Sequence, residues 1–175
     1  VMPKEEFNPL LADYIEEVRA RRVKPDSTPK LRLLLTGPEL ADPSYVRFIE
    51  DLGAVVAIDD LSSGTRYFWD LVDEEGEPWE ALARRYATRK ATCPRVHPQG
   101  SRMEHLKQLA QDYKVGAVID SIVKFCEPHG GVSPILKKEF AELDLPVLHL
   151  ERDYQMGSTG QLRTRVQAFF ESLGV

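Results

Sequence analysis

Cys126 is the residue whose position suggests the most chemistry. It follows an apolar run typical of a buried strand, and Gly130 and Gly131 come shortly after it, where a backbone without side chains lets a ligand approach closely. A thiolate is a nucleophile and a soft ligand for zinc or for an iron–sulfur cluster. One cysteine cannot hold a cluster alone, because clusters are held by several thiolates. The alternative is that Cys126 is a small buried apolar residue at the end of a strand.

A zinc site is a second interpretation. Cys93 and His97 are separated by three residues, and Cys126 and His129 are separated by two. Together the two pairs would supply the ligands of a tetrahedral zinc ion, although neither pair has the spacing of a recognised zinc finger. The alternative for Cys93 is a structural thiol.

An anion site is predicted near the end of the chain, where the sequence from Gly157 to Arg165 combines glycines with two arginines at the start of a helix. Free backbone N–H groups at a helix start attract anions, and nearby arginines add positive charge. We therefore expect Gly160, Gln161 and Arg163 to bind a substrate or another anion. The alternative is ordinary capping by Ser158 or Thr159, with the arginines on the surface.

Composition excludes several classes of protein. The 175 residues include 23 Lys and Arg against 28 Asp and Glu, a net charge of −5 that does not suit binding to duplex nucleic acid. No apolar run approaches the ~20 residues of a membrane span, and no signal-peptide pattern occurs. We expect a cytoplasmic protein with reduced thiols. Walker, Gly-x-Gly-x-x-Gly, Gly-x-Ser-x-Gly and His-Glu-x-x-His motifs are absent, and Val132 stands where a phosphatase loop would need arginine.

The elements that would position these residues alternate between strands and helices. Helix starts are predicted at Asp42-Pro43, at Pro78, at the capping box from Ser101 to Glu104, and at Ser133-Pro134. Trp69 and Trp79 are expected in the core or at an interface. The predicted strands lack strict alternation, as is typical of parallel strands covered on both faces; they are Leu31 to Leu35, Ala54 to Ile58, Gly116 to Ile122 and Pro146 to Leu150.

This alternation predicts an α/β fold: a doubly wound, flavodoxin-like, mostly parallel sheet of about four strands with helices on both faces. Ligands of such sheets lie outside the carboxyl ends of the strands, which is where Cys126 stands. His149 falls within a strand and is expected to be a hydrogen-bonded core residue.

The first 30 residues are expected to form a separate unit. Phe7 to Val18 has the apolar spacing of an amphipathic helix, and Lys24 to Pro29 is a linker that two prolines keep out of a helix. We divide the chain into a linking helix and linker at 1–30 and an α/β domain at 31–175. The start at Val1-Met2 favours a fragment, the C-terminal part of a longer two-domain subunit.

A series of short stretches, taken in order, carries a family resemblance. These stretches are Gly53-Ala54-Val55-Val56 with Asp59-Asp60-Leu61, Gly64-Thr65-Arg66, Cys93-Pro94 followed by Arg102, Lys124-Phe125-Cys126-Glu127-Pro128, Leu150-Glu151-Arg152-Asp153, and Gly160-Gln161-Leu162-Arg163-Thr164-Arg165 with Ala168-Phe169-Phe170-Glu171. The sequence thereby resembles the C-terminal half of subunits of the 2-hydroxyacyl-CoA dehydratase and benzoyl-CoA reductase family, such as the D-component of 2-hydroxyglutaryl-CoA dehydratase.

The resemblance implies an enzyme that acts on an acyl-CoA thioester through single-electron, ketyl radical chemistry. It further implies a homologous second subunit and an ATP-dependent iron–sulfur activator protein that supplies the electron. Each subunit of the family holds a [4Fe–4S] cluster through two cysteines of its N-terminal half and a third that matches Cys126, so Cys93 would be structural. Because that N-terminal half is absent here, the chain alone is expected to be colourless and inactive.

The competing hypothesis is a non-catalytic, flavodoxin-like interaction or scaffold domain of a hetero-oligomeric complex. Such a domain would bury an apolar face against a partner and perform no chemistry.

Overall fold

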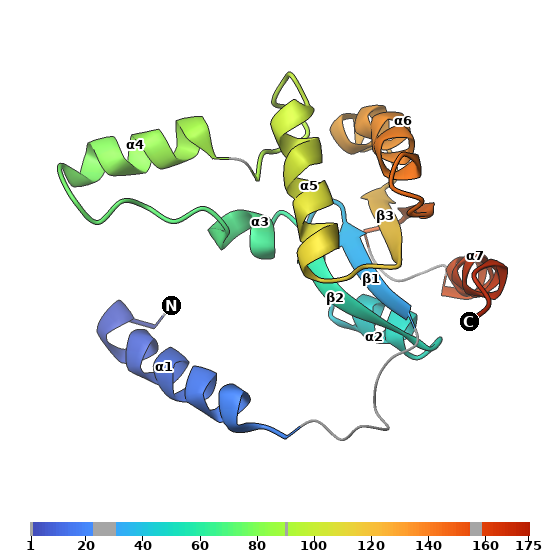
Figure 1. Cartoon of the computed structure of the whole chain (residues 1–175), viewed down its shortest axis with the longest axis horizontal. Coiled ribbons are helices and arrows are strands. Elements are labelled where there is room, and N and C mark those ends of the chain that lie inside the picture. Colours follow the sequence, from blue (N-terminus) through green and yellow to red (C-terminus); the bar gives the residue numbers. More distant parts are fainter. Residues whose placement is uncertain (1, 23–30, 90, 155–158) are drawn as a thin grey trace.

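The computed structural model describes residues 2–22, 31–89, 91–154 and 159–175. The predicted linker at 24–29 and the candidate cap Ser158 lie outside the described residues. The elements follow one another as shown in Figure 1: α1 (Lys4–Ala20), β1 (Leu31–Thr36), α2 (Ser44–Glu50), β2 (Ala54–Asp60), α3 (Thr65–Phe68), α4 (Pro78–Thr88), α5 (Gly100–Asp112), β3 (Ala117–Val123), α6 (Glu127–Ala141), β4 (Val147–Arg152) and α7 (Thr159–Ser172).

The four strands form one parallel sheet in the order β2-β1-β3-β4. Leu35 of β1 pairs with Asp59 of β2 on one side and with Ile119 of β3 on the other. The four predicted strands are therefore confirmed, each to within two residues at its ends. The strand order reverses between β1 and β3, which makes their carboxyl ends the place where a ligand is expected.

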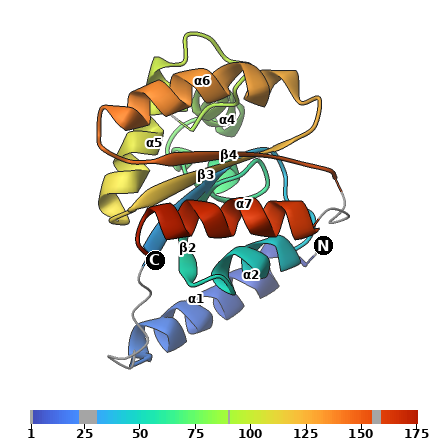
Figure 2. The ribbon, with the colours of Figure 1, turned by 90° about the vertical axis from the view of Figure 1, so that its right-hand side faces the viewer.

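Helices cover both faces of the sheet, as the apolar strands predicted. Leu33 and Leu35 of β1 point to the face that α2 and α7 cover, whereas Leu34 points to the face that α5 and α6 cover. Figure 2 shows the sheet edge-on between these two helical layers. The doubly wound α/β class is confirmed. None of the described helices is long and apolar enough to cross a membrane.

Helix α1 is formed as predicted but lies apart from the sheet (Figure 1). None of its residues is buried in this chain. Its apolar side chains are 39–56% exposed, and they occupy the predicted stripe: Phe7, Leu10, Leu11, Tyr14, Ile15 and Val18.

Three predicted helix starts are wrong. Pro43 rather than Asp42 is the cap of α2, although the Asp42 carboxylate still accepts a hydrogen bond from Ser44 N at 2.8 Å. Helix α5 begins at Gly100 without a side-chain cap, so the capping box from Ser101 lies inside the helix. Helix α6 begins at Glu127, ahead of the predicted Ser133-Pro134 start.

The early start of α6 has a local cause. Pro128 stands in the first turn, where a missing N–H removes no helical hydrogen bond and a fixed φ favours the helix. The glycines that suggested a loop after Cys126 are therefore helical. Of the two expectations for Trp79, a place in the core is wrong, since its side chain is 78% exposed, and a place at an interface stays a prediction. Trp69 packs against the core on the α5 side.

A buried group of charges holds the carboxyl edge of the sheet together. Asp60, the last residue of β2, is fully buried and accepts hydrogen bonds from Arg66 Nε at 3.0 Å and from Arg102 Nη2 at 2.6 Å. Thr36 at the end of β1 donates a third bond, at 2.8 Å. One carboxylate therefore joins the ends of two strands to α3 and α5.

This cluster holds one negative and two positive charges, and the two arginines keep Asp60 ionised. Burial raises the pKa of Asp60, but the guanidiniums of Arg102 and Arg66 outweigh that effect and hold the pKa at about 2. The two arginines also donate to backbone carbonyls, Arg66 to Gly37 at 3.0 Å and Arg102 to Thr92 at 2.9 Å. The two arginines that pair with Asp60 therefore also hold two loops at the carboxyl edge of the sheet.

Gly37, the residue that follows β1, lies against β3. A Cβ atom at this position would stand 2.1 Å from the carbonyl oxygen of Ser121, and the backbone has a φ of +157°. Only glycine permits this approach of the first loop to the third strand.

Replacement of Asp60 by asparagine tests the buried ion pairs. The change leaves two buried guanidiniums without a full negative partner, so we expect Asp60→Asn to lower the free energy of unfolding by about 3–5 kcal/mol in urea titrations. Asp73→Asn is the matched control, because Asp73 pairs with Arg84 at 3.3 Å on the surface and should cost less than ~1 kcal/mol. Equal effects of the two changes would contradict the role given to Asp60.

Candidate functional site

Cys126 lies at the carboxyl edge of the sheet, where it caps α6 after β3 has ended. Its backbone N–H donates to Val123 O at 3.0 Å, and its carbonyl accepts from Gly130 N at 2.9 Å. These bonds fix the turn, and the side chain is half-buried, with a free thiol. The residue is therefore at the rim of the sheet and not enclosed in the core.

Cys126 lines an open pocket of about 370 Å³. Ile122 and Phe125 supply apolar side chains to it, and Gly130 leaves room because it carries none. An added Cβ at Gly130 would meet Ile122 at an ordinary 3.8 Å. Three charged side chains complete the described lining: Lys124, Glu127 and Glu151.

His129 stands one helical turn beyond Cys126, on the side of α6 that faces the sheet. Its side chain is 8% exposed, and no hydrogen bond joins the imidazole to any described residue. Burial lowers the pKa of His129, the nearby Arg66 and Arg102 lower it further, and the result is a pKa of about 4. The ring is therefore neutral at neutral pH, and one of its nitrogens is a donor.

Asp120 of β3 connects α6 to the edge strand β4. Its carboxylate accepts a hydrogen bond from the Ser133 hydroxyl and bonds His149 Nδ1 at 2.8 Å. A nucleophilic serine would need a base as its partner, and here the carboxylate lies between serine and histidine. Both Ser133 and Asp120 are buried, so this group ties helix to sheet. The expected hydrogen bond of His149 is thereby confirmed, although the residue is half-buried and not part of the core.

The zinc interpretation is wrong for the part of the chain that is described. No three of its His, Cys, Asp or Glu side chains are placed to hold a metal ion together. His97 instead lines a second pocket, of about 400 Å³, on the other side of Pro128. Cys93 is half-buried and its carbonyl accepts a hydrogen bond from Val96 N at 2.9 Å.

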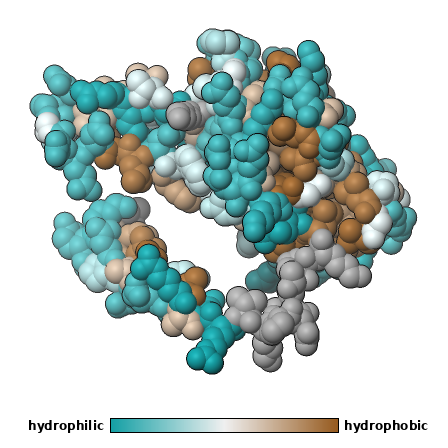
Figure 3. Space-filling view, viewed as in Figure 1, coloured by the Kyte–Doolittle hydropathy of each residue, from teal (hydrophilic) through white to brown (hydrophobic). Residues whose placement is uncertain are grey.

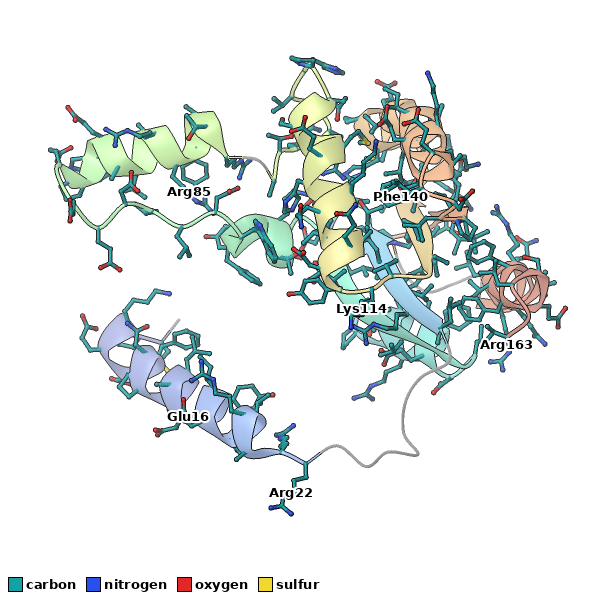
Figure 4. The ribbon with its side chains drawn as sticks, viewed as in Figure 1. Glu16, Arg22, Arg85, Lys114, Phe140 and Arg163 are labelled. Atoms are coloured by element: carbon teal, nitrogen blue, oxygen red, sulfur yellow. The ribbon has the colours of Figure 1, made fainter. Side chains whose placement is uncertain are left out.

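The candidate anion-binding residues lie on α7. Gly160, Gln161 and Arg163 are exposed, and none of them belongs to the described lining of the Cys126 pocket. Figure 4 labels Arg163 at the far end of the molecule from α4. Their binding of an anion stays a prediction.

Sequence reasoning missed a buried arginine at the end of β4. Arg152 is almost fully buried, donates to Glu39 O at 2.5 Å and lies over the ring of Tyr45, 5.6 Å from its centroid. Burial lowers the pKa of Arg152. The only signal in the sequence was its place in one of the stretches that carried the resemblance.

The low pKa of His129 predicts a loss of stability in mild acid. As the pH falls from 6.5 towards 4, the unfolded chain takes up a proton that the folded chain does not, so the folded state loses stability. We expect His129→Gln to reduce this loss by up to about 3 kcal/mol, measured by urea unfolding over that pH range.

The exposed His97, changed to Gln, is the control and should leave the pH dependence unchanged. Burial also lowers the pKa of His105, so the stability of the His129 variant should still fall somewhat as the pH is lowered. Asp60 causes a further loss of folding stability only at lower pH, between its ordinary pKa of 3.8 and its pKa of about 2 in the folded chain. An unchanged slope in the His129 variant would contradict the burial of a neutral imidazole.

Comparisons with known proteins agree with the architecture. Residues 1–173 match the family described as 2-hydroxyglutaryl-CoA dehydratase, D-component. The chain is 28% identical over 173 residues to the (R)-phenyllactyl-CoA dehydratase beta subunit of Clostridium sporogenes, covering 98% of this chain and 45% of that relative. It is 32% identical over 148 residues to the putative dehydratase subunit YjiM of Escherichia coli K12, covering 83% of this chain and 38% of the relative.

A third relative is matched over a similar share of its length. The lactoyl-CoA dehydratase subunit beta of Anaerotignum propionicum is 26% identical over 173 residues, which make up 98% of this chain and 46% of the relative. The chain thus spans less than half the length of each of these curated relatives. Because the family model extends over nearly all of it, the chain belongs to the 2-hydroxyglutaryl-CoA dehydratase D-component family.

Proposed function

We propose that this chain is the C-terminal domain of a 2-hydroxyacyl-CoA dehydratase subunit and that Cys126 is its ligand to a [4Fe–4S] cluster. The family match supports the reaction class. The observation that carries the proposal is the half-buried Cys126 thiol, which opens onto a pocket at the carboxyl end of β3. A homologous second subunit and an ATP-dependent iron–sulfur activator are the partners that this function requires.

The residues present fit one ligand position of an iron–sulfur cluster. A thiolate is the ligand that iron–sulfur clusters use, and the fixed turn around Cys126 presents it at an accessible rim. The described residues include no group of three side chains that could hold a metal ion together, so further ligands would come from the rest of the subunit. When bound, the cluster would supply one electron to the thioester of the substrate.

The chain's own side chains would prepare the pocket for that chemistry. Ile122 and Phe125 are the large apolar residues of its described lining, and a bound group that covered them would displace water and strengthen polar interactions inside. His129, one turn beyond Cys126, is buried against the sheet and stays neutral at neutral pH, so it adds no positive charge beside the site. The Asp60 ion pairs hold the neighbouring loops of the same edge in place.

Replacement of Cys126 tests the ligand role. In the complete complex, Cys126→Ser should abolish the visible absorbance and the EPR signal of this subunit's cluster, and dehydration of the acyl-CoA substrate with them. Cys93→Ser is the matched control: its thiol is equally half-buried but lies outside the described lining of the pocket, so the cluster should be retained. A full cluster in the Cys126 variant would favour the scaffold hypothesis.

We further propose that residues 1–30 join the α/β domain to the rest of the subunit. Figure 3 shows apolar side chains of α1 gathered on the side of the helix that faces α3 and α4 across open space. The six large apolar residues of this stripe do not pack into the core of this chain, because none of them is buried. Exposed patches of this kind mark interfaces, and the part of the relatives that the chain does not span would supply the covering surface.

A charge in the apolar stripe tests this interface. In the complete subunit, Leu11→Glu together with Ile15→Glu should loosen the contact between the two parts and speed limited proteolysis between them. In the 175-residue chain the same changes should leave thermal unfolding unaltered, since both side chains are exposed there. Asp13→Lys, outside the stripe, is the control. Proteolysis at the control rate would contradict the interface.

A further inference from the structure

Phe125, which precedes the candidate ligand, has a backbone conformation that aromatic residues rarely adopt. Its φ is +66°, in the left-handed region, where a side chain crowds the backbone and only glycine is free of strain. The other described non-glycine residues with positive φ, Lys114 and Asp144, follow the ends of α5 and α6. The end of a helix is the usual place for this conformation. Phe125 instead stands between a strand and a helix.

The ring of Phe125 contributes nothing to the folding of this chain. It is 99% exposed, more than any other large apolar side chain in the described part of the protein. An aromatic ring normally contributes by burying its large surface. Neither the strained backbone nor the exposed ring is therefore explained by the stability of the domain.

The turn around Phe125 is nevertheless firmly held. Lys124 N donates to Arg152 O at 2.9 Å, Cys126 N to Val123 O at 3.0 Å, and Glu127 N to Phe125 O at 3.1 Å. These bonds determine the conformation on both sides of the residue. Strain that surrounding bonds maintain in this way is typical of functional sites.

The ring and the Cys126 thiol line the same pocket. Only Ile122 adds another large apolar side chain there, and the rest of the described lining is charged or glycine, apart from the cysteine. A group bound to Cys126 would thus lie beside two large apolar residues, the buried Ile122 of the sheet and the exposed Phe125.

We propose that Phe125 is the shielding residue of the site: its ring packs on the iron–sulfur cluster held by Cys126 and separates it from water. This inference rests on the proposed function. The proposed role explains the strained turn, because the turn directs an aromatic ring away from the core and towards the bound group. Apolar cover controls solvent access to a cluster and thereby its reduction potential and its lifetime.

The first test uses the complete complex with its clusters loaded. We expect Phe125→Ala to raise several-fold the rates of iron release to a chelator and of bleaching in air. The midpoint potential should become less negative, because water stabilises the more negatively charged reduced cluster. Phe125→Leu, which keeps an apolar cover, should retain most of the wild-type behaviour. Phe68→Ala removes another exposed aromatic ring, on α3, and should change neither rate nor potential.

The second test measures the strain without any cluster. In the 175-residue chain, Phe125→Gly removes the left-handed penalty and loses no buried contact. We expect its melting temperature to rise by about 2–4 °C. The same change in the complete complex should speed cluster loss as much as alanine does. A lower melting temperature would show that the ring supports the fold and would overturn the inference.

The outcomes separate this inference from the function on which it rests. If Cys126→Ser retains the cluster, the ligand role fails and the shielding role fails with it. If Cys126→Ser loses the cluster while Phe125→Ala keeps the wild-type bleaching rate and potential, only the shielding role is wrong.

Discussion

The carboxyl edge of the sheet depends on one buried carboxylate that serves two guanidiniums. Taking Asp60, Arg66 and Arg102 out of water is costly, and only their close pairing compensates for it. The same arginines hold the loops after Gly37 and Thr92 through backbone carbonyls. Because each partner comes from a different element, loss of one leaves charges unpaired at the edge where the candidate site lies.

This arrangement gives a physical meaning to the stretches by which the family is recognised. The stretches that contain Asp60, Arg66 and Arg102 are part of the family resemblance, although they lie in three different elements. In the structure Asp60, Arg66 and Arg102 are buried and paired with one another, so they position the edge and line no part of the described pocket. The described lining of the open pocket comes mainly from the turn from Lys124 to Glu127, with Ile122, Gly130 and Glu151 beside it. The family pattern therefore combines a rigid support with one accessible thiol.

The strands were predictable because continuous Val, Ile and Leu runs occur where both faces of a sheet are covered. The start of α6 was not, since Gly130, Gly131 and Pro134 suggest a loop, whereas Pro128 in the first turn favours a helix. Cys126 was placed correctly at the rim because its position follows directly from a strand end. The partners of Asp60 could not be predicted from the sequence, because Arg102 is 42 residues away along the chain and only the fold brings the two together. No pattern in the sequence indicates the left-handed backbone of Phe125.

The central claim of this account is that Cys126 binds iron. A crystal structure of the complete, anaerobically purified complex, with data collected at the iron absorption edge, tests it most directly. The account predicts an anomalous iron peak within bonding distance of Cys126 Sγ, with the remaining ligands from parts of the subunit that this chain does not include. A cluster bound entirely by other residues, with Cys126 Sγ out of bonding distance, would contradict it.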